Sequence, residues 1–171
     1  MDFLNFAKSR YSVRSFKNTE IEEDKIRKIL DAGRSAPTAS NRQPQKVYVL
    51  KSEESRVKLS SLCRYIFSAP MVLAVCYDRN LVWQNTAMPG CDSGDTDAAI
   101  VCTHMMLEAW QLGIGSCWVG NFNSDQVKAA LNLPDNLVVS VLMPMGYPAD
   151  GYVPDPRHYS NRDYKETVEV L

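Results

Sequence analysis

The sequence has only two histidines, His104 and His158, and lacks the residue spacings that usually carry protein-based chemistry. It contains no H-E-x-x-H metal pattern and no arrangement of an acid, a histidine and a nucleophile. The G-x-G-x-x-G dinucleotide fingerprint and the Walker motif are also absent. We therefore expect no metal site, and if the chain is an enzyme, a cofactor has to supply the difficult chemistry.

The chain also lacks an excess of charge and a long apolar run. Its 19 basic and 20 acidic residues give a net charge of −1, so there is no basic surplus to neutralise nucleic acid phosphates. The longest apolar run, APMVLAVCY, has nine residues and is too short to cross a bilayer. The N-terminus has an acid at position 2 and no apolar segment of signal-peptide length. We expect neither a nucleic acid nor a membrane partner.

Cysteines are few and none forms a C-x-x-C pair. Their odd number indicates free thiols in a reducing compartment, so we expect a cytoplasmic protein. Only Cys91 falls in an expected loop. The five are Cys63, Cys76, Cys91, Cys102 and Cys117.

What is present is an alternation of helical and strand patterns over one domain, residues 1–171. Thr19 and Glu22 form a possible capping box for a helix beginning near Ile21, and Ser52 and Ser124 are candidate caps of two later helices. We expect an α+β or α/β sandwich with at least four strands flanked by helices. The other expected helices cover 3–9, 52–63, 97–112 and 124–131, and the expected strands cover 46–50, 71–77, 116–122 and 136–146.

Residues 97–112 give the most pronounced helical pattern. The polar positions Asp97, His104, Glu108 and Gln111 fall in one narrow stripe, and the rest is apolar nearly all round. Such a helix should be buried on most sides and pack against a second subunit. We expect His104 to be a packed or hydrogen-bonded structural residue.

Two segments have no periodic pattern. Residues 78–96 form the one long loop, a kind of segment that is often functional, and 147–171 form an irregular tail. Whether Trp83, Cys91 or His104 lines a substrate pocket stays open at this stage.

Three stretches contain groups suited to binding. In RYSVR, an extended backbone would point Arg10, Ser12 and Arg14 to one face, where guanidinium groups bind phosphate; the alternative is a solvated basic turn. The stretch SAPTASNRQPQ has amide and hydroxyl groups that suit a polar ring edge, or it is a turn that satisfies its own backbone. In GIGSCWVGNF, Gly120 could let the backbone approach a flat ligand.

Together these stretches resemble the FMN-dependent nitroreductase family, in the family's order. The matching pieces are RYSVRSF, SAPTASNRQPQ, DAAIVCTHMMLEAWQLGIGSCWVG and LMPMGYPAD. The resemblance implies a mostly antiparallel sheet, with the long central helix at the interface of a homodimer that holds two FMN sites shared between subunits. It also implies that NAD(P)H supplies electrons, which leave to nitroaromatic, quinone or similar small-molecule acceptors by a ping-pong route at flavin N5.

The same resemblance assigns the site residues, with no catalytic side chain among them. The phosphate and ribityl chain would be held near the N-terminus and by Arg162 in the tail, with Arg157 a weaker candidate to share the phosphate. Asn41 would face the pyrimidine ring of the flavin and Arg42 would not. The implied cofactor-binding residues are Arg10, Tyr11, Ser12, Arg14, Pro37, Thr38, Ala39, Asn41, Gln43, Trp118, Val119, Gly120 and Arg162.

The chain departs from the family in two ways. Gln45 stands where an aromatic residue often follows the Q-P pair, and the chain is short, so that loop 78–96 replaces the segments that usually shape the substrate pocket. Two alternatives remain: a flavin store or sensor of the same fold that does not turn over, and a relative that uses the flavin on a specialised substrate.

Overall fold

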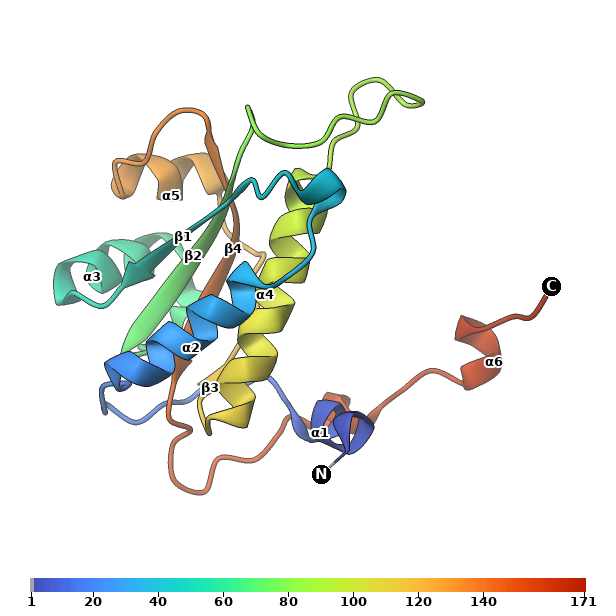
Figure 1. The fold of residues 1–171 in the computed structure, drawn as a ribbon. Coiled ribbons are helices and arrows are strands. Elements are labelled where there is room, and N and C mark those ends of the chain that lie inside the picture. The colour runs from blue at the N-terminus through green and yellow to red at the C-terminus, as the bar shows by residue number, and fades with distance from the viewer. Residues whose placement is uncertain (1) are drawn as a thin grey trace.

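A computed structural model describes residues 2–171, in which helices cover both faces of one antiparallel sheet (Figure 1). The strand order is β1-β2-β4-β3, which confirms the expected α+β class and four-stranded sheet. The strands are β1 (Gln45–Leu50), β2 (Met71–Asp78), β3 (Gly115–Ser116) and β4 (Leu137–Gly146). The helices are α1 (Phe3–Ser9), α2 (Glu23–Arg34), α3 (Glu53–Leu62), α4 (Gly94–Gln111), α5 (Ser124–Ala130) and α6 (Tyr164–Thr167).

The central strand β2 is the apolar run expected from the sequence. It pairs with β1 on one side, Gln45 facing Tyr77, and with β4 on the other, Met71 facing Met145. All its residues except the last are buried, because helices cover both faces of the sheet. The shorter β1 lies at the sheet edge.

Side-chain alternation divides the core into two layers. Leu73 and Val75 face α2 and α4, whereas Ala74 and Cys76 face the side of α3 and α5. Helices α2 and α4 pack closely because Gly33 has no side chain: a Cβ there would lie 2.7 Å from Cγ of Met105. The sheet and α4 thus form a rigid frame for the loops at its two ends.

Helix α4 has one fully buried face and one half-exposed face. The buried face includes Ala98, Val101 and Met105, which lie on the sheet. Nδ1 of His104 lies 2.9 Å from the carbonyl oxygen of Ile100, so the ring is bonded within its own helix, as expected. No helix in the described part of the chain has the length and apolarity to cross a membrane.

Several local expectations are wrong. Thr19 does not cap α2; the helix begins after Glu22, and no side chain caps it. Asn123 caps α5 in place of Ser124, whose hydroxyl is used by Val139 of β4 instead. The strand expected over 116–122 is reduced to β3 and an isolated bridge at Val119, and α4 starts at Gly94 rather than near Asp97.

The tail first returns to the body and then leaves it. The backbone of Tyr147 and Ala149 bonds to Lys17 and Ser15 of the N-terminal segment. Beyond the 3-10 turn Pro156–Tyr159, the chain extends away and ends in α6, well separated from the sheet in Figure 1.

Candidate functional site

A cavity of about 270 Å³ brings the N-terminal motif together with the tail. Four residues singled out by the sequence line it, and three tail residues complete it. The lining residues are Arg10, Tyr11, Ser12, Arg14, Asp155, Arg157 and His158. The cavity therefore has three guanidinium groups and one carboxylate.

The motif RYSVR is extended around Ser12, the conformation in which its spacing would place Arg10, Ser12 and Arg14 on one face. Ser12 forms a bridge to Ser116 of β3, and the N–H of Val13 donates to the carbonyl of Ser116 at 2.9 Å. Val13 is fully buried against Gly115, where a Cβ would lie 2.6 Å from the valine side chain. Its neighbours Ser12 and Arg14 therefore point to the opposite side, into the cavity.

Arg10 is the most unusual charged group of the cavity. Its Nη1 is buried and has no hydrogen-bond partner in the described residues, and burial lowers the pKa of the guanidinium. A buried polar atom without a partner is costly, more so when it is charged. The donor set and this unpaired atom fit a phosphate group, which accepts hydrogen bonds from guanidinium nitrogens and hydroxyls.

Cys117 lies beside this cavity. Burial raises the pKa of its thiol, and the positive charge of Arg14, with hydrogen bonds from Ser12 and Arg14, acts in the opposite direction. The thiol is therefore part of the wall between the motif and the core rather than an exposed nucleophile.

Three tail residues in or near the cavity, Tyr152, Asp155 and His158, were not assigned to the site by sequence reasoning. The Tyr152 hydroxyl accepts from the Arg14 N–H at 3.1 Å and donates to the Ser12 carbonyl at 3.3 Å. Asp155 caps the turn Pro156–Tyr159 through the backbone N–H of Arg157. An aspartate followed by proline is a turn-start signal that could have identified Asp155; Tyr152 has no such signal.

Asp155 and Arg157 form a two-point ion pair. Nε and Nη2 of Arg157 donate to the two carboxylate oxygens at 2.9 and 2.8 Å. The pKa of Asp155 lies well below its usual range, chiefly because the side chain and backbone of Arg157 donate to it, and also because of the charge of Arg14. Arg162 lies outside the cavity and pairs with Glu166 at 3.0 Å.

The second candidate stretch, the 37–43 loop, lies beside the N-terminal end of α4. Ser40, Asn41 and Gln43 have left-handed backbones with φ of about 50°, so the loop is tightly folded. The hydroxyl of Thr38 accepts from the N–H of Gln43 at 3.0 Å. Asn41 and Gln43 are exposed, and their side chains have room to meet a ligand or another chain.

Asp97 anchors this loop. Its two carboxylate oxygens accept from the N–H of Ala39 at 2.9 Å and from the hydroxyl of Ser93 at 2.7 Å. The same hydroxyl accepts from the N–H of Trp83 at the base of the 78–96 loop. Asp97 is almost fully buried, and it therefore joins the two loops to the start of α4.

The third stretch runs along β4. Val119 exchanges backbone hydrogen bonds with Leu142 at 2.9 and 3.0 Å, which fixes the strand-like path past β3. Trp118 is 45% exposed, and a Cβ built at Gly120 would have no heavy atom within 4 Å. This edge is open, so the chain's own packing does not require the glycine.

The candidate stretches lie at opposite ends of the molecule. The 37–43 loop meets the end of β2, where Pro44 accepts from the N–H of Asp78, whereas Ser12 lies beside Ser116 at the other end of the sheet. Helix α4, with 18 residues, spans about 27 Å between these ends. One chain therefore does not bring the guanidinium cluster and the polar loop to one place.

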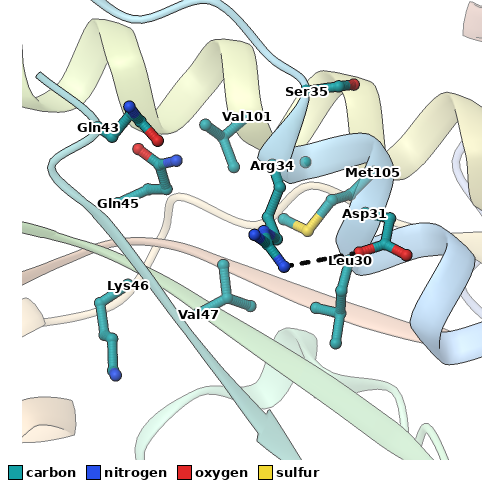
Figure 2. A pocket seen from close by; sticks show the side chains of 11 residues that line it. Leu30, Asp31, Arg34, Ser35, Gln43, Gln45, Lys46, Val47, Val101 and Met105 are labelled. Carbon is teal, nitrogen blue, oxygen red and sulfur yellow. Dashed lines mark ion pairs between the residues drawn. The ribbon is translucent and has the colours of Figure 1, made fainter. Parts of the chain in front are cut away.

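A larger cavity, about 740 Å³, lies between α2, α4 and β1 (Figure 2). Figure 2 shows apolar side chains such as Val47 and Met105 lining it, with Arg34 and Asp31, an ion pair at 4.0 Å, at its rim. It reaches the 37–43 loop only through Gln43 and contains none of the guanidinium cluster. Residues 2–171 place no group of three or more His, Cys, Asp or Glu suitable for a metal.

Comparison with known proteins identifies the family. Residues 7–67 and 62–147 match the model described as the Nitroreductase family. A protein of Archaeoglobus fulgidus, provisionally named an NADH dehydrogenase/NAD(P)H nitroreductase, is 30% identical over 173 residues, which cover 95% of this chain and 97% of the relative.

Solved structures show the same relationship. A nitroreductase family protein from Clostridium difficile 630 is 38% identical with a TM-score of 0.91, covering 99% of this chain and 98% of that chain. A provisionally identified nitroreductase from Desulfovibrio desulfuricans in complex with FMN shares the fold at 24% identity and a TM-score of 0.83, covering 98% of this chain and 95% of that chain. The chain belongs to the nitroreductase family.

Proposed function

We propose that the chain is an FMN-dependent oxidoreductase that takes electrons from NADH or NADPH and passes them to nitroaromatic compounds, quinones or similar small acceptors. The observation that carries this proposal is the cavity lined by Arg10, Arg14 and Arg157, whose guanidinium groups, with the hydroxyl of Ser12, are donors that suit a phosphate. In a nitroreductase family member, the FMN phosphate is the group that such a cavity suits. The five unpaired thiols agree with our proposed cytoplasmic location.

The proposed roles follow from the geometry. Arg10, Ser12 and Arg14, with Tyr11 beside them, hold the phosphate and the ribityl chain, and Arg157 shares the phosphate. The tail bearing Arg162 would have to fold back before this residue could join them. The other proposed site residues contact the flavin ring. Asn41 faces its pyrimidine edge, and Arg42 does not. These ring contacts come from Pro37, Thr38, Ala39, Asn41, Gln43, Trp118, Val119 and Gly120.

The proposed active form is a homodimer. FMN is shorter than α4, so the guanidinium cluster and the 37–43 loop of a single chain do not reach one molecule of it. A second copy with its α4 running in the opposite direction would bring its own loop to the first copy's cluster. The half-exposed apolar side chains Ile100, Met106, Leu107 and Trp110 supply a surface for this contact.

When bound, FMN supplies hydride acceptance and donation at N5, which suits a ping-pong reaction with two substrates in turn. The chain's own residues fix the position of the flavin through its phosphate and through the pyrimidine edge. No side-chain acid or base is required, which agrees with the absence of such a group from the motifs described above.

The proposal is tested by loading the purified chain with FMN and adding NADH or NADPH anaerobically. The visible flavin bands should bleach and should return when a quinone or a nitroaromatic compound is added. A chain that cannot be loaded with FMN would refute the proposal. Arg14→Ala should weaken FMN binding, whereas Arg42→Ala, which removes an equal charge from the loop, should leave it unchanged.

A separate experiment tests whether each FMN site combines residues of both chains of the proposed homodimer. Arg14→Ala and Asn41→Ala chains, each deficient alone, are unfolded and refolded together. In a mixed dimer, one site combines the intact Arg14 of one chain with the intact Asn41 of the other, so FMN binding and reductase activity should partly return. Mixed refolding without recovery would show that each site is built within one chain.

The alternative is a flavin store or sensor that does not turn over. It would take up FMN with the same residues but would not oxidise NADH or NADPH with any acceptor. The protruding 78–96 loop beside the 37–43 loop favours turnover, because such a loop suits contact with a second substrate.

A further inference from the structure

The cavity proposed to bind the FMN phosphate also contains a carboxylate, that of Asp155. Its three guanidinium groups and the single Asp155 carboxylate give a net charge of +2. The carboxylate is the more buried partner of its ion pair, with 33% of the side chain exposed against 83% for Arg157. Both partners line the cavity, and the charge of Arg14 also acts on Asp155 and lowers its pKa.

The geometry of the ion pair shows which donors of Arg157 are already occupied. An arginine binds phosphate most strongly through two parallel N–H groups, and Nε with Nη2 is one such edge. In this chain both groups of that edge already donate to the Asp155 carboxylate, at 2.9 and 2.8 Å. A phosphate that used this edge of Arg157 would have to displace the carboxylate, or would lie against a like charge.

We propose that Asp155 is an affinity-setting residue that competes with the FMN phosphate for Arg157. This inference rests on the proposed FMN site. With the cofactor absent, Asp155 neutralises part of the cavity and holds Arg157 in place. During FMN binding it is a like charge beside the phosphate, so it weakens the affinity and makes the cofactor exchangeable.

Asp155 could act on FMN binding in two different ways, by competing with the phosphate or by positioning Arg157. If Asp155 competes, removing its charge tightens the binding of a phosphorylated flavin. If it only positions Arg157, the same change loosens the arginine and weakens binding. The two roles therefore predict opposite signs for one measurement.

The test compares the dissociation constants of FMN and riboflavin, measured by quenching of flavin fluorescence on the full chain. Asp155→Asn keeps an oxygen that accepts from the Arg157 N–H, so it preserves the turn. We expect FMN to bind roughly twofold to fivefold more tightly, the upper part of the range for one charge pair at a partly exposed site. Riboflavin, which lacks the phosphate, should bind as to the unchanged chain.

Asp150→Asn is the matched control. It removes the same charge from the same tail, but Asp150 pairs with Lys17 and lies outside the cavity. Its FMN affinity should change by less than that of Asp155→Asn. Asp155→Ser, which also keeps a capping oxygen, should repeat the effect of Asp155→Asn and guards against a folding defect in one variant.

Each outcome decides something. Tighter FMN binding in both Asp155 variants with unchanged riboflavin binding supports the inference. Unchanged or weaker FMN binding, or equal tightening of riboflavin, overturns it while the proposed function stands. An unaltered chain that binds no FMN overturns both.

Discussion

Replacing Asp97 with alanine should destabilise the fold and release the 37–43 loop. The change removes the acceptors of two hydrogen bonds, one from the N–H of Ala39 and one from the hydroxyl of Ser93. Hydrogen bonds to a charged group contribute about 1.5–3 kcal/mol each. Because the loop can take up water once it is free, we take the lower figure for both and expect a loss of about 3 kcal/mol.

For a domain of this size, 1 kcal/mol corresponds to about 2–4 °C in the melting temperature. The melting temperature of Asp97→Ala, measured by circular dichroism at fixed protein concentration, should therefore be about 6–12 °C lower than that of the unchanged chain. Asp97→Asn is the matched control, because its oxygen can still accept from Ala39 and its amide can donate to Ser93. It should lose about 1 kcal/mol, the size of a single neutral hydrogen bond.

Trypsin gives a local measure of the same change. Arg42 lies within the 37–43 loop, so a released loop should be cut after Arg42 faster than the unchanged chain. An Asp97→Ala chain that melts within 2 °C of the unchanged protein, a difference of less than about 1 kcal/mol, would refute the reasoning. Unaltered cleavage after Arg42 would show that the carboxylate does not anchor the loop.

Three further outcomes are expected. Gly94→Ala should cost roughly 1–3 kcal/mol in urea unfolding, because its Cβ would lie 2.4 Å from Cε2 of Tyr77 and overpack the core; equal midpoints would contradict this. The Tyr147 hydroxyl donates to the carboxylate of Glu22, and this bond, with other hydrogen bonds, lowers the pKa of Glu22 from 4.5 to about 2. The stability that this carboxylate contributes is therefore present above pH 4.5 and is lost as the pH falls toward 2. Tyr147→Phe should flatten that acid dependence in pH-dependent unfolding. Ellman's reagent at pH 8 should react quickly with Cys91 alone, and a second fast thiol would contradict the burial of the other four.

The sheet and the main helices could be predicted because their signals are local. Residues 71–77, within the longest apolar run, were expected to form a strand, and the buried strand β2 confirms it. Ser52 caps α3 as expected, since its hydroxyl accepts from the N–H of Ser55. In both cases the pattern lies within a few residues of the element that it predicts.

The wrong predictions concern groups whose hydrogen-bond partners are decided by segments distant in sequence, which a local pattern does not reveal. Ser124 has the side chain of a cap, but its hydroxyl is used by Val139 from β4, which is distant in sequence, and Asn123 caps the helix instead. The 116–122 segment has strand-like residues, but its regular pairing ends at Ser116 in β3. Beyond that residue, the N–H of Cys117 donates to the carbonyl of Pro144, and Val119 forms an isolated bridge to Leu142.

The site was predicted in part. The sequence left open whether RYSVR is extended or a basic turn, and the structure brings Arg10, Ser12 and Arg14 to one cavity. Asp155 and Tyr152 complete that neighbourhood through a tail that returns by backbone bonds, and an irregular tail has no periodic signal. The contacts of the 37–43 loop with a flavin remain a prediction, as does the part of Arg162.

The clamp at the base of the 78–96 loop has a practical consequence for engineering. Trp83 and Ser93 are bonded to each other and, through Ser93, to Asp97, while the residues between them project from the body (Figure 1). Residues can be inserted or exchanged between these anchors without changing where α4 begins. The loop is thus a place where segments from other proteins can be grafted, and its exposed Cys91 is a ready attachment point for a fluorescent reporter.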